Sequence, residues 1–389
     1  MKVLPVNDAR TKLVERKCGI QKKGSLGPFS EWESHHLPLT LTLNINKCFL
    51  SFPRTMAKSS ENLNPNYIKR FKRGGTITSF IGFFLGSCFT LIYFVAPFYV
   101  FTAVALPVFV QKLGWSLIAK VWAPIVLSVV LPTLHAPNFV QYVLPPMLTF
   151  FNYDEIHETS DDEMLQYFGE GKSCILVAQP HGVLSLTGIC SATYCIPEFR
   201  KIKTAAASAL INFPILKQVM GIFGLFSASK KSLLKHLKKG GAAGTVVIYV
   251  GGIAELFKCS ETEERLFLKH RKGFVKLALQ TGTPLIPLYM FGNTTVLTPC
   301  RWKVLENISR TLQASITYVW GTAGLPIPRK KTLCYVRGKM IVIPKIEEPT
   351  QADIDKWHAA YIAEVTRIYE KYSRVVCDGD YANKTLLIE

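Results

Sequence analysis

The chain lacks several features that mark common classes of protein. Its ten cysteines form no Cys-x-x-Cys pair and no Cys/His spacing suited to zinc, which argues against a metal site and agrees with a reducing compartment. No Gly-x-Ser-x-Gly segment is present, and no cysteine stands beside a histidine in a nucleophile motif. Internal repeats are also absent. We therefore expect neither a metalloenzyme nor a covalent serine or cysteine mechanism.

One long segment carries no charge. Residues 76–110 contain no Asp, Glu, Lys, Arg or His, and as a single helix they would measure about 52 Å against a hydrocarbon core of about 30 Å. Pro97 and Pro107 are expected to interrupt this run, and a second apolar stretch follows at 121–134. A core helix of a soluble protein normally shows a polar stripe, which this run lacks. The pattern predicts two membrane-embedded segments that form a hairpin.

This hydrophobic region divides the chain into three predicted parts. Residues 1–73 form a polar tail, residues 74–134 the membrane-embedded hairpin, and residues 135–389 one folded domain. The tail has no early apolar core of the kind a secretory signal requires, so the first hydrophobic run is expected to direct the chain to the membrane.

Charge around the hairpin predicts its orientation. The basic segment 69–73 stands immediately before the first hydrophobic run, and the positive-inside rule places the tail in the cytosol. A hairpin returns the large domain to the cytosol as well. Three Asn-x-Ser/Thr sequons, at Asn293, Asn307 and Asn383, would be glycosylated only in the opposite topology.

Basic residues outnumber acidic ones, 46 to 27, which gives a formal net charge of +19. Such a charge suits nucleic acid, anionic lipid headgroups or a phosphorylated substrate. The membrane segment argues against nucleic acid, and we expect no nucleic-acid partner. Most of the basic clusters are expected to be solvated or to face lipid.

From residue 173 onward, apolar runs alternate with glycine or polar turns and with helical patterns, which is typical of an α/β domain. Helices are predicted at 231–239 and 274–280, and Thr350 with Asp353 can open a third. Continuous apolar strands indicate a sheet covered on both faces. The predicted strands are 174–178, 204–207, 245–250, 285–290 and 340–343.

The most informative segment is Gln179-Pro180-His181-Gly182, directly after the first of these strands. Pro180 fixes φ and Gly182 removes bulk, so the turn can leave the His181 ring exposed where α/β proteins place their ligands. An imidazole titrates near pH ~6.5, which suits a general base acting on an alcohol. A helix beginning at Val183 would keep this base neutral. The alternative is a turn residue whose ring caps a backbone carbonyl.

A second candidate element is residues 250–255, where a strand runs into Gly251 and Gly252. Paired glycines let bare backbone N–H groups approach a phosphate or an oxyanion. Glu255 is expected just past this turn, where it could orient His181, bind an acceptor hydroxyl or favour a helix start by its charge. Spacing alone favours the structural role.

Several ordered elements together resemble the type-2 diacylglycerol acyltransferase family, which also includes monoacylglycerol and wax-alcohol acyltransferases. The resemblance extends from about residue 165 to residue 372. Residues 179–182 match the His-Pro-His-Gly motif, 250–255 match Val-Gly-Gly-x-x-Glu, 271–274 match Arg-Lys-Gly-Phe, 324–328 match Gly-Leu-Pro-Ile-Pro, and 349–361 match the terminal Pro-Thr…Ile-Asp…His…Tyr pattern.

Two positions depart from the family pattern. Gln179 replaces the first histidine of the motif, and Asn293 stands where the family usually shows the glutamate of Phe-Gly-Glu. Because Gln179 cannot act as an acid or base, the resemblance implies that His181 is the base and that position 179 is a hydrogen-bonding support. Related acyltransferases use a His-x-x-x-x-Asp pair, but residue 186 here is Leu186. Glu255 is then the best candidate for a carboxylate partner.

The resemblance implies a glycerolipid-acyltransferase-like α/β domain, with a central sheet flanked by helices, preceded by the membrane-embedded hairpin. It also implies an acyl-CoA-dependent O-acyltransferase of the endoplasmic reticulum membrane, with its catalytic domain facing the cytosol and lipid droplets as a second location. His181 would deprotonate diacylglycerol, whose alkoxide would attack the acyl-CoA thioester without a cofactor, a metal or a covalent intermediate. Homo-oligomerisation is left open.

Two further roles follow from the resemblance. Backbone N–H groups near Gly182, Gly251 and Gly252 would stabilise the oxyanion. Arg271 and Lys272 would hold the phosphates of coenzyme A.

Other readings of the sequence remain open. The acceptor could instead be monoacylglycerol or a long-chain alcohol, and no motif decides between them. The two departures also fit a non-enzymatic scaffold or tether at the membrane or lipid-droplet surface. A membrane protein that binds nucleic acid is a poorer reading of the charge.

Overall fold

The computed structural model describes residues 67–109, 114–260, 262–312 and 315–389. The chain divides into two units after Pro53, and all of the described residues belong to the second, Arg54–Glu389. Most of the predicted tail, residues 1–73, therefore lies outside the described residues. Its last part does not, because residues 68–70 form an edge strand of the sheet.

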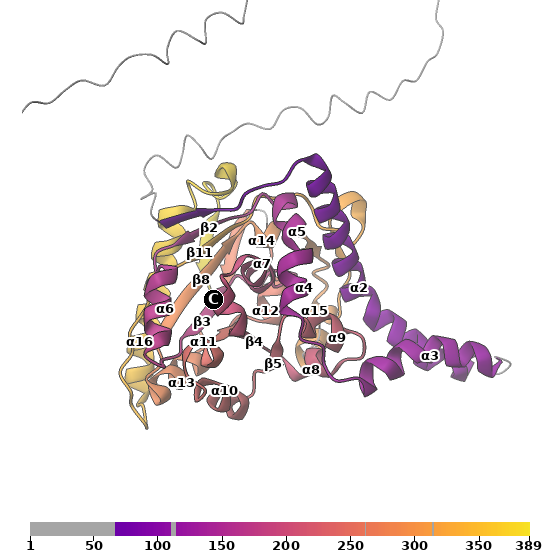
Figure 1. The fold of residues 1–389 in the computed structure, drawn as a ribbon, viewed down its shortest axis with the longest axis horizontal. Helices are drawn as coiled ribbons and strands as arrows, with labels where there is room; N and C mark the ends of the chain where they lie inside the picture. Colours follow the sequence, from indigo (N-terminus) through magenta and orange to yellow (C-terminus); the bar gives the residue numbers. More distant parts are fainter. Residues whose placement is uncertain (1–66, 110–113, 261, 313–314) are drawn as a thin grey trace, which may run out of the picture. The chain divides into compact units, whose positions relative to one another are not determined.

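The second unit is built around one mixed sheet (Figure 1). Its strands in spatial order are β1 (Ile68–Arg70), β2 (Asp154–His157), β11 (Cys334–Arg337), β8 (Leu285–Phe291), β3 (Ile175–Gln179), β6 (Val246–Ile248), β4 (Lys203–Ala206) and β5 (Leu225–Ser227). The strands from β8 to β5 run parallel to one another, and β11 runs antiparallel to β8 and parallel to β2. Every residue of β3 and β8 is buried, as expected for strands covered on both faces.

Helices flank this sheet, so the predicted α/β class is confirmed. The longer ones are α6 (Asp161–Gly169), α7 (Leu186–Tyr194), α10 (Lys230–Leu237), α13 (Gly273–Thr281), α15 (Lys303–Leu312) and α16 (Gln351–Tyr372). The shorter ones are α4 (Pro137–Val143), α5 (Pro145–Phe150), α8 (Ser208–Asn212), α9 (Leu216–Gly221), α11 (Gly241–Gly244), α12 (Ile253–Leu256) and α14 (Asn293–Val296). Small strands pair outside the main sheet: β7 (Glu263–Leu266) with β12 (Thr385–Ile388), and β9 (Thr298–Pro299) with β10 (Val319–Trp320).

Three helix predictions are confirmed within two residues: α10, α13 and the start of α16. The α16 start is fixed as expected, because the Thr350 hydroxyl accepts the Asp353 N–H and the Asp353 carboxylate accepts the Thr350 N–H. The predicted helix start at Val183 is wrong. Helix α7 begins at Leu186 with Ser185 as its N-cap residue, because Val183 turns into the core instead.

Four of the five predicted strands are confirmed, although β6 is shorter than expected. The strand predicted at 340–343 is wrong: only an isolated antiparallel bridge joins Ile341 to Leu285 there. The true strand is β11, which the charge of Arg337 concealed. That arginine is buried and lies 2.7 Å from a carboxylate oxygen of Asp161, so its charge is paired within the fold.

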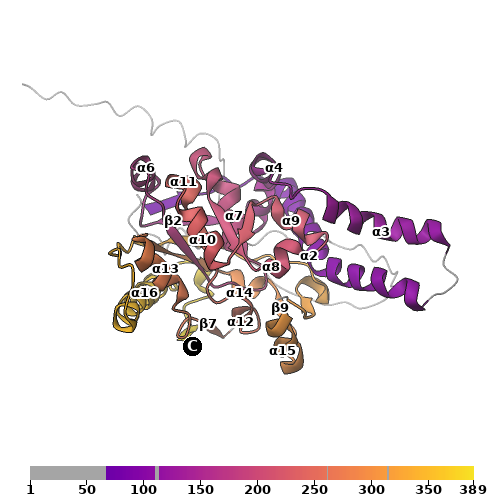
Figure 2. The same ribbon diagram turned by 90° about the horizontal axis from the view of Figure 1, so that it is seen from below.

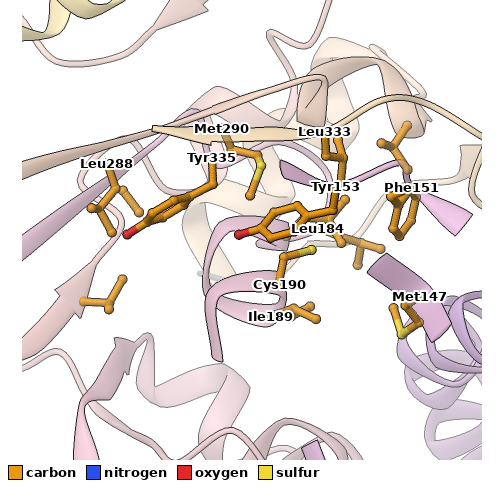
Figure 3. Packing of buried hydrophobic residues seen from close by; sticks show 14 of the residues in the cluster. Met147, Phe151, Tyr153, Leu184, Ile189, Cys190, Leu288, Met290, Leu333 and Tyr335 are labelled. Carbon is orange, nitrogen blue, oxygen red and sulfur yellow. The ribbon is translucent and has the colours of Figure 1, made fainter. Parts of the chain in front are cut away.

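Helix α7 packs beneath the sheet and thereby positions the segment that precedes it. Figure 3 shows Ile189 and Cys190 of α7 on one side of a buried cluster that also contains Leu288 and Met290 of β8 and Tyr335 of β11. All five side chains are buried. This contact anchors the start of α7, and with it the turn that leaves β3.

The uncharged segment forms one continuous helix, α2 (Thr76–Phe109), with Pro97 and Pro107 inside it. The expectation that these prolines interrupt the run is wrong, since each removes a backbone donor while keeping φ helical. The span Thr76–Pro107 has a mean hydropathy of 2.0 and is long and apolar enough to cross a membrane. The second apolar stretch lies in a shorter helix, α3 (Trp115–Val130).

Helices α2 and α3 extend beyond the sheet and its flanking helices (Figure 2). They lie side by side, with the Tyr99 hydroxyl donating to the Val121 carbonyl at 2.6 Å. The first half of α2 is tightly packed instead. A Cβ atom at Gly82 would lie 2.0 Å from the Pro146 carbonyl oxygen of α5. Helix α2 therefore belongs both to the folded unit and to its apolar extension.

Candidate functional site

The turn after β3 has its backbone held by two side chains from distant segments. The His181 N–H donates to Glu255 Oε2 at 2.7 Å. The carbonyls of Pro180 and His181 both accept from Asn293 Nδ2, at 3.1 and 3.0 Å. Gly182 has a φ of +65°, which L side chains rarely adopt. The sequence-predicted motif is therefore a rigid turn at the C-terminal end of a central parallel strand.

The His181 ring has one assigned tautomer in this setting. Its Nδ1 lies 2.8 Å from the Gly182 carbonyl oxygen, and since a carbonyl only accepts, Nδ1 carries the proton. Nε2 is then unprotonated and accepts from the Ser185 hydroxyl at 3.4 Å. Tyr249 packs edge-on against the ring, with 5.2 Å between ring centroids.

Burial lowers the pKa of His181 from its usual 6.5, and the hydrogen bond to the Gly182 carbonyl opposes this shift. The ring is therefore neutral at physiological pH, as a general base requires. The expected cause was a helix start at Val183, but that helix begins later. Desolvation produces the neutral state instead.

Gln179 ends β3 and is joined to Pro180 by a cis peptide bond. Its side chain is completely buried, and within the described residues its amide has no hydrogen-bond partner of good geometry. Tyr361 is close by: burial raises the pKa of its hydroxyl, and the Gln179 side chain lowers it. The position is a polar side chain behind the turn, and a supporting role there stays a prediction.

Glu255 contacts the backbone beside the imidazole. Its carboxylate accepts the His181 N–H through one oxygen and the Phe267 N–H through the other, the latter at 3.0 Å. The side chain is 2% exposed, and burial raises its pKa to about 7; the two N–H donors oppose this shift and the nearby Glu264 adds to it. Glu255 therefore ties two loops together through their backbone N–H groups.

Gly251 and Gly252 are required to be glycine for different structural reasons. A Cβ atom at Gly251 would lie 1.9 Å from the Glu255 carboxyl carbon, so the carboxylate folds back across that residue. Gly252 has a φ of +55° and lines a cavity together with His181. The glycine that reaches the cavity is suited to present its backbone to a ligand.

A cavity of about 1380 Å³ lies over the turn, and both His181 and Ser185 line it. On one side its wall comes from the apolar helix α2, and on the other from α10 and α13, which lie apart from α2 in both views (Figures 1 and 2). The α2 residues are Phe89, Tyr93, Pro97 and Phe101. The lining cations are Lys230, Arg271, Lys276 and Arg310.

The structure separates Arg271 from Lys272, which the sequence treats as a pair. Arg271 lines the cavity, with its guanidinium 5.1 Å from the centroid of the Phe267 ring. Lys272 forms an ion pair with Asp355 at 2.6 Å instead. Only Arg271 is placed to meet a ligand in the cavity.

Sequence reasoning missed three residues around His181. Ser185 stands one helical turn after the histidine, a spacing that could have signalled it. The Tyr249 hydroxyl accepts the Gly188 N–H at 2.6 Å and donates to the Ser185 carbonyl at 3.2 Å. In the sequence, Tyr249 directly precedes the glycine element at 250–255. Asn293 was noticed only as a departure from a pattern.

Within the described ranges, no group of three or more His, Cys, Asp or Glu side chains is placed to hold a metal ion. The fold and site together define an α/β protein in which a neutral histidine at the end of a parallel strand faces a large cavity with cationic and apolar walls. The sequence pattern of the diacylglycerol acyltransferase family matches residues 147–382. The chain belongs to this family.

Individual relatives agree. Diacylglycerol O-acyltransferase 2 of Danio rerio is 34% identical over 215 residues, which cover 50% of this chain and 59% of that protein. The human protein of the same name is 32% identical over 218 residues, covering 50% of this chain and 55% of its own length. The chain thus matches little more than half the length of these relatives. Among solved structures, the 1-acyl-sn-glycerophosphate acyltransferase of Thermotoga maritima has a TM-score of 0.40 and 11% identity, covering 76% of this chain and 95% of that one.

Proposed function

We propose that this chain is an acyl-CoA-dependent O-acyltransferase that converts diacylglycerol to triacylglycerol, with His181 as the general base. One observation carries the proposal: His181 lines a cavity that has cations on one wall and an uncharged, membrane-length helix on another. A phosphate-bearing, water-soluble donor fits the first wall, and a lipid acceptor fits the second. The names of the relatives support this choice of substrates.

The reaction is a direct transfer. His181 Nε2 takes the proton of the acceptor hydroxyl as the oxygen attacks the thioester carbonyl. A C–O bond forms, the C–S bond breaks, and coenzyme A leaves as a thiolate that receives the proton from the imidazolium. The Ser185 hydroxyl lies 3.4 Å from Nε2, and both residues line the cavity. No covalent enzyme intermediate and no cofactor is needed.

The surrounding residues hold the turn and stabilise charge. Glu255 acts as a positioning residue, because its carboxylate holds the His181 backbone. Backbone N–H groups of Gly182, Gly251 and Gly252 are the candidates for the oxyanion site, and Gly252 is favoured because it lines the cavity. Gln179 supports the turn from behind.

The donor is held through its phosphates. Arg271 is the main contact, since a guanidinium binds phosphate through two parallel hydrogen bonds. Lys230, Lys276 and Arg310 line the same cavity and add positive charge. Lys272 contributes less because it is paired with Asp355.

Helices α2 and α3 form a membrane-embedded hairpin in the endoplasmic reticulum, with the sheet domain on the cytosolic face and with access to lipid droplets. In this arrangement α2 brings the acceptor from the bilayer directly to the cavity wall that it forms. The orientation is tested by glycosylation in microsomes. Asn307 and Asn383 are exposed and serve as reporters, whereas Asn293 is buried. Glycosylation of either reporter would place the domain in the lumen and contradict the proposal.

The activity is tested in microsomes from a host that lacks neutral-lipid synthesis. Labelled oleoyl-CoA is supplied with diacylglycerol, monoacylglycerol or a fatty alcohol, to wild type and to His181→Ala. We expect labelled triacylglycerol from wild type alone. A product formed only from another acceptor would correct the substrate. No product from folded, inserted protein would favour a membrane scaffold, and near-normal transfer by His181→Ala would remove His181 as the base.

A further inference from the structure

Asn293 packs against the turn that contains His181. It is the first residue of α14, follows β8, and its side chain is 2% exposed. A Cβ atom placed on Gly182 would lie 2.5 Å from Asn293 Nδ2, so the amide is packed directly against the turn. The same nitrogen donates to two consecutive carbonyls, those of Pro180 and His181.

The orientation of this amide is fixed by its surroundings. Nδ2 carries two hydrogens, and each meets one carbonyl oxygen. A flipped amide would point Oδ1 at both carbonyl oxygens. Because all three oxygens are acceptors, they would repel one another and no hydrogen bond would form. Within the described residues Oδ1 has no hydrogen-bond partner, so the side chain acts here as a donor alone.

The consequence reaches the imidazole through Gly182. With the two preceding carbonyls held by Asn293, the Gly182 carbonyl turns back toward the ring and accepts from Nδ1 at 2.8 Å. That contact keeps the proton on Nδ1 and leaves Nε2 unprotonated on the side of Ser185. Asn293, by clamping the backbone, sets the tautomer of a ring that it does not touch.

We propose that Asn293 is a positioning residue for acyl transfer, which holds the turn in the conformation that makes His181 Nε2 the basic nitrogen. The proposal rests on the proposed role of His181 as base. It concerns this chain in particular, because Asn293 stands where the family usually shows a glutamate and its amide supplies one hydrogen to each of the two carbonyls. An ionised carboxylate of the same shape would face two carbonyl oxygens with no hydrogen to share, and a protonated one would supply a single donor.

The first test is Asn293→Asp, which keeps the shape and removes the amide hydrogens. We expect kcat at neutral pH to fall about 10²-fold, as for a misplaced catalytic group, with little change in KM for acyl-CoA. Acidification protonates the new carboxyl and returns one donor. The ratio of variant to wild-type kcat is therefore expected to rise as the pH is lowered.

A matched control is Thr294→Val, which alters the next buried residue of α14. The Thr294 hydroxyl donates to Glu264 and does not reach the turn. We expect its kcat to stay near wild type although its thermal stability falls. Should Asn293→Asp fold poorly, Asn293→Ser, which keeps one donor, is expected to lose less kcat than Asn293→Ala.

The outcomes separate the two proposals. A wild-type kcat in Asn293→Asp, a ratio that does not change with pH, or an equal loss in Thr294→Val would overturn the positioning role. These results leave the base untouched if His181→Ala is inactive. An active His181→Ala would instead remove the proposed base, whatever the Asn293 variants show.

Discussion

Two histidines, one in β2 and one in the turn after β3, show what separates a structural histidine from a candidate base. His157 is the last residue of β2. Its ring lies 2.8 Å from the carboxylate of Glu155 and 3.4 Å from that of Asp161. Arg337 completes this buried charge cluster. His181 has no carboxylate on its ring, a single backbone carbonyl on Nδ1, and a large cavity beside it. A ring surrounded by charged partners stabilises the fold, whereas a ring with one unprotonated nitrogen beside a cavity can act on a ligand.

The same substitution at both histidines gives the largest expected contrast. His181→Gln is expected to lower kcat by about 10³-fold, because the proposed general base is lost, with little effect on the unfolding temperature. His157→Gln is expected to keep the kcat of the folded protein but to lose about 2 kcal/mol of stability, since buried charged groups lose a partner. Acyl-transfer rates and thermal unfolding of both variants measure this. Similar phenotypes for the two variants would break the comparison.

The next largest effect is expected at Glu255. Glu255→Gln keeps the shape, but its amide cannot accept both the His181 and the Phe267 N–H groups. We expect kcat to fall about 10-fold or more, because the turn loses an anchor. The measurement is the steady-state kcat, and KM for acyl-CoA is expected to stay unchanged. A loss as large as that of His181→Gln would instead point to a direct chemical role for the carboxylate.

Arg271 and Lys272 allow a test of which cation binds the proposed acyl-CoA donor. Arg271→Ala is expected to raise KM for acyl-CoA about 10-fold, the value of one charge-assisted contact. Lys272→Ala is expected to change KM little, since its ammonium is paired with Asp355 outside the cavity. Steady-state kinetics of both variants at fixed salt provide the measurement. Equal effects would contradict the separation that the structure makes.

The last expected effect is a pH dependence of stability. Burial raises the pKa of Glu255 and of Glu264 to about 7, from an ordinary value of 4.5. Because folding raises these pKa values, the stabilising contribution is full below pH 4.5 and is lost as the pH rises through about 7. We expect the unfolding temperature to fall over this range, and Glu264→Gln to flatten the dependence. A stability that rises with pH there would contradict the assignment.

Local patterns predicted much of this molecule. The apolar strand at 174–178 and the turn at 179–182 could be predicted because strands and turns depend on neighbouring residues. The contact of Asn293 with that turn joins residues 113 positions apart, and no local pattern carries such information. The strand containing Arg337 was hidden for a similar reason, because its ion pair with Asp161 spans 176 positions. Tertiary partners decide whether a polar residue is buried.

The sequence also could not predict that α2 lines the cavity. Its composition predicts a membrane helix, and α2 is apolar enough for one. Composition does not show that Phe89 and Phe101 also form a wall beside His181. That role depends on the packing of the first half of α2 against α5, which brings the helix to the sheet.

The most direct test of the central claim is the pH dependence of kcat/KM for acyl transfer by the wild-type protein. A neutral His181 with a pKa lowered by burial predicts a flat rate at neutral pH and a loss of rate on the acid side, with an apparent pKa below 6.5. An acid limb centred at about 7, the pKa of Glu255, or no acid limb at all, would contradict His181 as the base.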